Sequence, residues 1–234
     1  SMRDRMAVVH DAARTFMKVL RPGDRGAVVA FNEHVRVLQE LTADPAAIER
    51  AINAAVAQGS TGLHNAIYVT LKQFGRPTRG DGEVRRQALA VLSDGEDTSS
   101  LVSFEDVLAL ARQMGVSIYT IGLQSSIRPA GAPSNVDRFS GATYSLNMLA
   151  RETGARAFFP ATVHDLKRVY GAIARELEAQ YSIGYSPTNP RMDGRFRRIV
   201  VRVTSSPHHR PRTRTGYTAG PASAAPEAVH HPLR

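Results

Sequence analysis

Two short segments of the chain place oxygen-bearing side chains beside apolar runs. Residues 91–100 read VLSDGEDTSS, so an apolar run is followed at once by carboxylates and hydroxyls. Residues 59–62 read GSTG and place Thr61 just before a helix-like segment. Clusters of hard oxygen groups suit a divalent cation such as Mg²⁺, general acid–base chemistry, or the cap of a helix. Which of these uses applies depends on the helices and strands that surround the two segments.

Apolar periodicity predicts that helices and strands alternate along residues 1–180. Helical spacing predicts helices at residues 6–20, 45–56, 63–74, 104–114, 143–152 and 163–180. Short apolar or alternating runs predict strands at residues 26–31, 35–41, 87–93, 116–123 and 155–159. This order predicts an α/β, Rossmann-like fold, with helices around a mostly parallel central sheet that has one antiparallel edge strand.

The predicted sheet brings the oxygen-rich segments to one edge. Ligands of such sheets bind outside the carboxyl ends of the strands. Asp94 follows the predicted strand 87–93 directly, and the loop that carries Thr61 is expected over the same edge. The long loop of residues 124–141, rich in Ser, Pro and Gly, leaves that edge too. We therefore expect the functional site there.

After residue 180 the pattern changes to short strands. Residues 181–185 and 196–203 are predicted to pair through a turn at residues 193–194, and residues 212–217 add a third strand. We expect a C-terminal β-hairpin extension over residues 181–219. Residues 220–234 are small, polar and Pro-rich, which is typical of a disordered tail.

Composition narrows the class of protein. The chain has 234 residues, a net charge of +9 and no Cys, so disulfides and thiolate metal sites are excluded. No apolar run reaches the roughly 18 residues of a membrane span. The basic charge is nearly all Arg, which fits either codon bias or attraction to an acidic surface.

Several of these segments together resemble the von Willebrand factor A (VWA) domain. GSTGLHNAIYVTL resembles its threonine loop and VLSDGEDTSS its third metal-site loop, while PGDRGAVVAFNEHVRVLQELT and VSIYTIGL are similar to its strands. The resemblance implies a non-enzymatic binding module with a metal-ion-dependent adhesion site for Mg²⁺ or Mn²⁺. Its ligands would be Thr61, Asp94 and Ser1, the last as the final serine of an Asp-x-Ser-x-Ser motif.

The resemblance also implies a partner and a cellular address. An acidic side chain of a protein partner would complete the metal coordination. We expect loop 124–141 to set partner specificity through five of its residues, which are Ser126, Arg128, Asn135, Asp137 and Arg138. Residues 181–220 are similar to the tail of VWA-related bacterial proteins of the Acidobacterial type, which favours export to the periplasm or outside the cell.

The family's first strand and its Asp-x-Ser are missing from the sequence. SMRDRM resembles the segment that comes directly after Asp-x-Ser-Gly in the family. The strand would lie between residues 26–31 and 87–93, so we expect residues 1–180 to be a VWA domain cut from a longer product. A cloning remnant at Ser1 on a trimmed domain is the competing interpretation.

Two other functions stay open. A strand-end Asp94 also suits a Mg²⁺-dependent phosphoryl-transfer enzyme, although the G-x-x-x-x-G-K-[ST] loop and an assignable G-x-S-x-G triad are both absent. The basic face also allows nucleic-acid binding. For single residues, Thr61 is alternatively a helix cap, Glu96 and Asp97 fit a solvated turn or a cap, and His64 fits a packing or surface role.

Overall fold

The structure is a computed structural model of the chain. It describes residues 2–18, 20–21, 23–57, 59–74, 86–93, 97–123, 141–205, 208 and 210–220, with side chains from Met6 onward. None of the helices in these ranges is long and apolar enough to cross a membrane.

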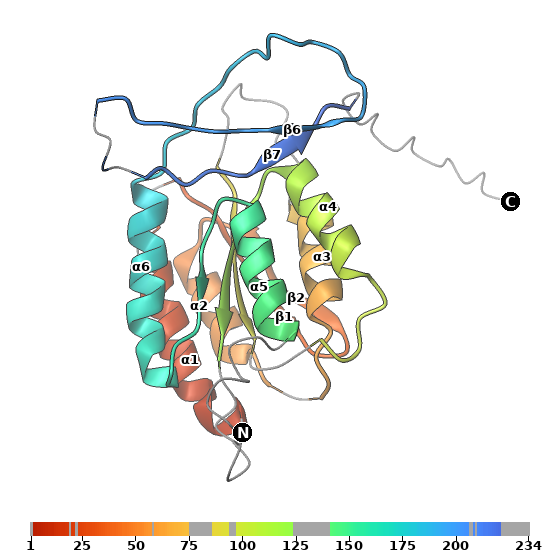
Figure 1. The fold of residues 1–234 in the computed structure, drawn as a ribbon. Helices are drawn as coiled ribbons and strands as arrows, with labels where there is room; N and C mark the ends of the chain where they lie inside the picture. Colours follow the sequence, from red (N-terminus) through yellow and green to blue (C-terminus); the bar gives the residue numbers. More distant parts are fainter. Residues whose placement is uncertain are drawn as a thin grey trace, which may run out of the picture.

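The described residues form a three-layer α/β/α structure, as the sequence predicts (Figure 1). The helices are α1 (Met2–Met17), α2 (Pro45–Ala54), α3 (Leu63–Phe74), α4 (Phe104–Met114), α5 (Gly141–Glu152) and α6 (Leu166–Glu178), with the 3-10 turn η2 (Val163–Asp165) before α6. The strands are β1 (Gly26–Phe31), β2 (Val35–Thr42), β3 (Ala88–Ser93), β4 (Ser117–Gly122), β5 (Ala157–Phe158), β6 (Phe196–Arg198) and β7 (Gly216–Thr218).

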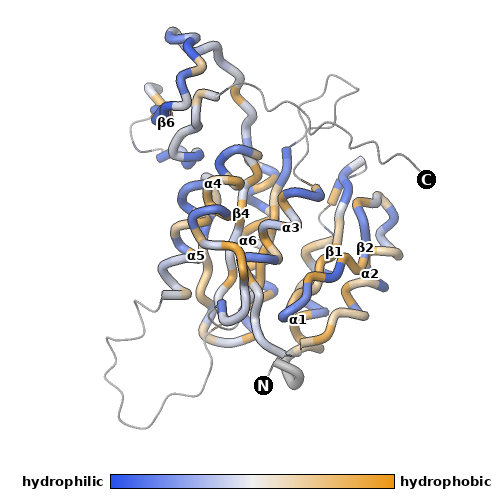
Figure 2. The backbone as a smooth tube through the Cα atoms, turned by 90° about the vertical axis from the view of Figure 1, so that its right-hand side faces the viewer, coloured by the Kyte–Doolittle hydropathy of each residue, from blue (hydrophilic) through white to orange (hydrophobic). Residues whose placement is uncertain are grey.

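Strand β4 is the centre of the core. Every residue of β4 is buried, and its side chains alternate between two apolar clusters. Ile118 packs with residues of α3, α4 and α5, whereas Tyr119 and Ile121 pack with residues of α1 and α6. This period of two is what a strand covered on both faces requires. Figure 2 shows the same pattern, with hydrophobic segments inside and hydrophilic ones in the loops.

Capping side chains and a glycine mark the ends of α2 and α4. Ser103 caps α4, because its Oγ accepts a hydrogen bond of 3.1 Å from the backbone N–H of Asp106. Gly115 ends the same helix with a φ of +68° in the left-handed region. Asp44 caps α2 by accepting from the N–H of Ala46 at 2.9 Å. Of these contacts, the Ser103 cap marks where the segment after β3 ends and α4 begins.

The strands of the body form two separate ladders. β1 and β2 pair in an antiparallel hairpin, as predicted, and β3, β4 and β5 form a parallel sheet in that order. Among the described residues, no ladder joins β1 to β3. The residues of β1 are all half-buried, while those of β4 are all buried. The edges of β1 and β3 that lack a partner lie where the resemblance places a further strand.

The C-terminal extension differs from its prediction. Residues 181–185 form no strand, and β6 pairs with β7 instead. The predicted strands 196–203 and 212–217 shrink to Phe196–Arg198 and Gly216–Thr218. The ring of Phe196 lies against Gly216, where a Cβ would stand 2.4 Å from the ring, so the pairing depends on that glycine. Tyr181 and Ile183 stay largely exposed, because no apolar surface covers them.

Candidate functional site

The loop of Thr61 is joined to the segment that follows β3. The carbonyl oxygen of Thr61 accepts hydrogen bonds from the backbone N–H of Thr98 at 2.9 Å and of Ser99 at 3.2 Å. In return, the N–H of Thr61 donates to Thr98 Oγ1 at 3.1 Å. Two loops that lie 37 residues apart are thus held as one unit, which confirms that both loops meet at one edge.

The turn between β1 and β2 joins this unit. The backbone N–H of Gly62 donates to the carbonyl oxygen of Asn32 at 2.7 Å. A Cβ at position 62 would lie only 2.8 Å from that oxygen, so only glycine permits the approach. Three loops therefore meet at the end of the sheet towards which the strand arrows point (Figure 1).

Asp97 fastens the start of α3. Its Oδ2 accepts from the backbone N–H of His64 at 2.7 Å, and its Oδ1 accepts from the N–H of Ser100 at 2.9 Å. Burial opposes ionisation, but these hydrogen bonds and the nearby His64 ring outweigh it, so the pKa of Asp97 is lowered. Of the two roles expected for Asp97, the structure selects the helix cap, supplied from a different loop.

Asn65 anchors the far part of the same segment. Its Oδ1 accepts from the backbone N–H groups of Leu101 and Val102, both at 3.1 Å, and its own N–H donates to Ser100 Oγ at 2.9 Å. Sequence reasoning missed this residue. Its position in the first turn of α3, after the Thr61 loop, is the only sequence signal that points to it. The bonds hold Leu101 in place, although its side chain is 96% exposed.

Ser99 carries an unused polar atom beside the Thr61 loop. Its Oγ is buried and has no hydrogen-bond partner among the described residues. It lies 3.4 Å from where a Cβ of Gly62 would stand. An orphaned buried hydroxyl costs about 1–3 kcal/mol unless a water or an ion satisfies it. The Ser99 hydroxyl is therefore an oxygen ligand of the kind that hard cations and their bound waters use.

Of the expected metal ligands, only Thr61 lies within the described residues, and it stands where the three loops meet. Asp94, Ser1 and Glu96 lie outside those residues, as do Ser126, Arg128, Asn135, Asp137 and Arg138. His64 takes a packing role against Phe104 and lies 3.5 Å from Asp97. Within the described ranges, no three His, Cys, Asp or Glu side chains group as metal ligands.

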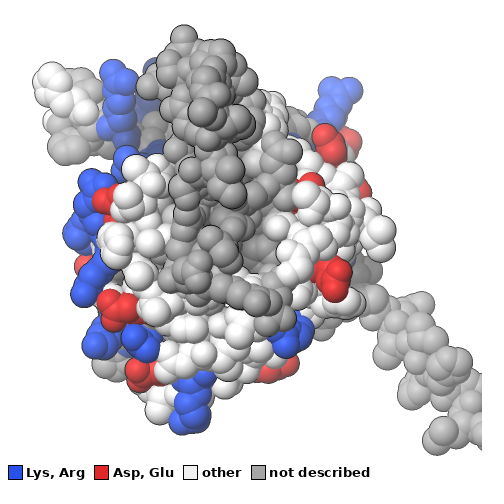
Figure 3. Space-filling model, turned by 90° about the horizontal axis from the view of Figure 1, so that it is seen from below, with Lys and Arg blue, Asp and Glu red and all other residues white. Residues whose placement is uncertain are grey.

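The charged side chains of the described residues lie around the rim of this end of the molecule. Seen from below, the described residues next to the undescribed centre are mostly uncharged, and both signs of charge lie towards the rim (Figure 3).

The parallel sheet, the covering helices and the loop site at the strand carboxyl ends define an α/β binding domain of the Rossmann-like class. A profile of the von Willebrand factor type A domain matches residues 1–171. The chain therefore belongs to the VWA family, whose members commonly mediate metal-dependent protein interactions and are generally not enzymes.

Solved structures show the same fold. A von Willebrand factor type A protein from Catenulispora acidiphila matches with a TM-score of 0.57 and 18% identity over 73% of this chain and 38% of that one. Proximal thread matrix protein 1 of the mussel byssus, with a zinc-occupied metal-site motif, matches with a TM-score of 0.57 and 14% identity over 73% and 42%. BatB from Bacteroides thetaiotaomicron matches with a TM-score of 0.55 and 14% identity over 74% and 87%.

These identities establish the fold alone. The chain spans well under half the length of the first two of these proteins. No curated protein matches it.

Proposed function

We propose that this chain is a non-enzymatic binding module that captures an acidic side chain of a protein partner through a divalent cation, Mg²⁺ or Mn²⁺. The observation that carries the proposal is the junction of the Thr61 loop with residues 97–100. This junction gathers hydroxyls, among them the buried Ser99 Oγ, which has no hydrogen-bond partner within the part of the chain that the structure describes. The zinc in the metal-site motif of the mussel protein supports a metal at this place in the fold.

The proposed ligands are Thr61, Asp94 and Ser1. Hydroxyls and few carboxylates would leave the cation electron-poor and partly hydrated, which is how Mg²⁺ is commonly held. When bound, the cation would supply a Lewis-acidic position for one more carboxylate, which the partner provides. The roles of Asp97 and Asn65 are to hold the loops in place through backbone hydrogen bonds rather than to bind the metal.

The charge of the chain favours such a partner. A net charge of +9 attracts acidic proteins and speeds their encounter.

We also propose that loop 124–141 sets partner choice, through Ser126, Arg128, Asn135, Asp137 and Arg138. The proposed cellular address is outside the cytoplasm, as the resemblance to exported bacterial VWA-related proteins suggests.

A further strand is part of the proposal. We infer that a strand ending in Asp-x-Ser pairs between β1 and β3 in the full-length gene product. The unjoined ladders and the half-buried residues of β1 support this. Metal binding should therefore be measured on the full-length product.

Titration with Mn²⁺ and Mg²⁺ by calorimetry tests the proposal. Thr61→Ala and Asp94→Ala should each weaken metal binding by about tenfold or more, because each removes an oxygen ligand. Thr70→Ala is the matched control, since Thr70 Oγ1 only returns to the carbonyl oxygen of Ala66 within α3. Circular dichroism should show the same fold in all variants. Metal binding by Thr61→Ala equal to that of the parent would refute the site.

A further inference from the structure

A second site lies at the opposite end of the sheet. A cavity of about 490 Å³ opens between the C-terminal extension, the end of α5 and the start of β5. Because β3, β4 and β5 are parallel, the start of β5 marks their amino ends, away from the Thr61 loop. Figure 1 shows the extension at this end, beyond the last turns of α5 and α6. The cavity therefore has no part in the proposed metal site.

Arginines dominate the lining of this cavity. They are Arg151 from α5, Arg156 before β5, and Arg198, Arg212 and Arg214 from the extension, and the described residues of the lining include no acidic one. The extension itself is strongly basic, since residues 181–220 contain eight arginines and a single acidic residue, Asp193. An apolar wall is contributed by residues 199–201. The lining thus joins strong positive charge to a strip of low polarity.

The neighbouring carboxylates neutralise only part of this charge. Glu176 forms ion pairs with Arg156, at 3.7 Å, and with Arg212. Glu152 pairs with Arg112, which does not line the cavity. Among the described residues, Arg151, Arg198 and Arg214 have no ion pair. Three positive charges around one cavity repel one another, and an anion between them would relieve that repulsion.

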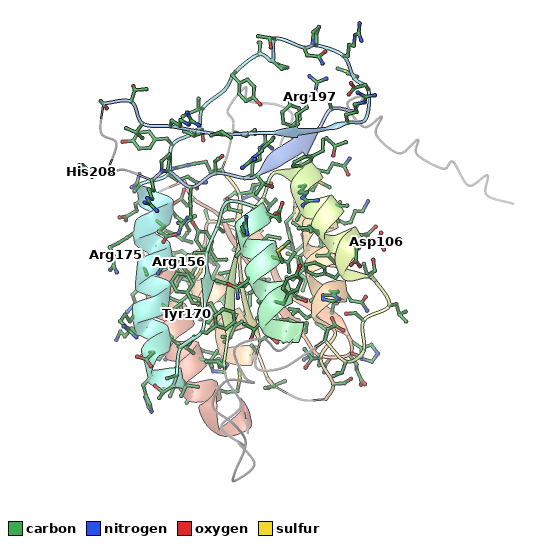
Figure 4. All side chains as sticks on the ribbon, in the orientation of Figure 1. Asp106, Arg156, Tyr170, Arg175, Arg197 and His208 are labelled. Carbon is green, nitrogen blue, oxygen red and sulfur yellow. The ribbon has the colours of Figure 1, made fainter. Side chains whose placement is uncertain are left out.

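Aromatic rings orient two of these arginines. The guanidinium of Arg156 lies over the ring of Phe158 at 5.1 Å, and that of Arg214 lies over Tyr217 at 5.9 Å. Figure 4 shows Arg156 between α6 and α5 in this view and Arg175 on the outer side of α6. Stacked guanidiniums keep their donor edges free and lose less entropy on binding, which suits recognition of a planar or tetrahedral oxyanion.

We propose that this cavity binds a compact phosphate-bearing ligand. Three guanidiniums that have no ion pair with the described residues call for at least two negative charges in one small group. A phosphate ester or pyrophosphate supplies these charges, and a single carboxylate does not. The volume falls in the range of small-molecule sites, about 300–1,000 Å³. The apolar wall at residues 199–201 would contact the non-phosphate part of an ester.

Calorimetric titration with inorganic pyrophosphate tests the proposal. The experiment is run in EDTA, so that it does not depend on the metal site. The parent chain should bind one pyrophosphate in a saturable way. A double variant, Arg151→Gln with Arg198→Gln, should lose about tenfold or more in affinity, because it removes two charged donors that form no ion pair with the described residues. Thr61→Ala should bind pyrophosphate like the parent.

Arg175→Gln with Arg50→Gln is the matched control. It removes the same charge from exposed positions on α6 and α2, away from the cavity lining. Its affinity should stay close to that of the parent. Equal losses in the two double variants would show a general attraction of anions to a basic surface and would overturn the site, as would the absence of binding by the parent.

A competition assay identifies the source of the phosphate. Vesicles with phosphatidylglycerol and a single-stranded oligonucleotide are each offered to the parent chain. Release of bound vesicles by pyrophosphate would show that the cavity takes a lipid headgroup, while no vesicle binding would leave a soluble phosphate as the ligand. Both results support the site. Binding of vesicles or oligonucleotide that pyrophosphate cannot displace would place the anion-binding surface elsewhere and overturn it.

Discussion

At the residue scale, the candidate metal site depends on side chains that bind no metal themselves. Asp97 uses both carboxylate oxygens to accept backbone N–H groups, one from α3 and one from its own loop. A carboxylate near the start of a helix also faces the positive end of the helix dipole. Asp97 is therefore a structural charge that sets the position of the Thr61 loop relative to the segment after β3.

Asp97→Asn should lower the free energy of unfolding at neutral pH by about 1–3 kcal/mol, because one carboxylate oxygen becomes an NH₂ group that cannot accept a hydrogen bond. The folded-state pKa of Asp97 lies below its ordinary value of 3.8. Its contribution is therefore complete above pH 3.8 and is lost as the pH falls through the lower folded value. Urea unfolding at several pH values measures both effects.

Asp11→Asn is the control for that substitution, since the Asp11 carboxylate is 61% exposed. It should leave the unfolding free energy nearly unchanged. If Asp97→Asn proved as stable as the parent at neutral pH, the cap would not hold the loops together, and the geometry of the site would need another cause.

At the scale of elements, the contact between α5 and the extension depends on one glycine. Gly154 has a φ of +79°, and a Cβ there would lie 2.6 Å from the backbone nitrogen of Arg214. Gly154→Ala should therefore push the backbone of residues 213–215 away from the body. Trypsin should then cut the extension faster at its arginines, which limited proteolysis followed by mass spectrometry measures.

Gly184→Ala is the matched control within the extension, because a Cβ at that position would meet nothing within 4 Å. Its cleavage should follow that of the parent. Equal cleavage of Gly154→Ala and the parent would mean that the extension accommodates the methyl group and does not rest closely on the end of α5.

The sequence predicts local elements of this fold better than distant pairings. The bounds of β1, α3 and α4 agree with their predictions, because their apolar periods, caps and glycine stops lie within the elements themselves. The strand predicted at residues 181–185 is wrong, since strand pairing depends on a partner elsewhere in the chain. β6 pairs with β7 instead, with Arg198 opposite Gly216.

The candidate site divides in the same way. The position of the Thr61 loop over this edge of the sheet agrees with its prediction, while the role of Thr61 as a metal ligand stays a prediction. Asn65 and Asp97 act on backbone groups 33–37 residues away, and no local pattern shows which of several polar residues will reach so far. The roles of Asp94 and Ser1 stay predictions.

At the scale of the whole molecule, the parallel sheet of β3, β4 and β5 separates two ends with different chemistry. The hydroxyl-rich loops lie at the carboxyl ends of the strands, and the arginine-lined cavity lies at their amino ends. The arginine-lined cavity exists only while the extension is docked on the body. Glu152 is central to that docking, because its carboxylate accepts from Arg112 at 2.6 Å and from Thr215 Oγ1.

Acid should therefore loosen the extension before it unfolds the body. Burial of Glu152 opposes ionisation, but the hydrogen bonds from Thr215 and Arg112 and the charge of Arg112 outweigh it, so the pKa of Glu152 lies below its ordinary value of 4.5. The carboxylate then contributes fully to stability above pH 4.5, and this contribution is lost as the pH falls through the folded-state value.

Glu152→Gln should mimic this loss at neutral pH, with a fall of about 1–3 kcal/mol in the free energy of unfolding because the charged partner of Arg112 is gone. The difference from the parent should shrink between about pH 7 and about pH 3, since protonated Glu and Gln carry the same charge. Glu178→Gln, at an exposed position of α6, serves as the control. A difference of the same size at both pH values would show that the charge of Glu152 is not what holds the extension.

The pyrophosphate affinity of Glu152→Gln should fall together with its stability, because Arg198 and Arg214 reach the cavity only from the docked extension.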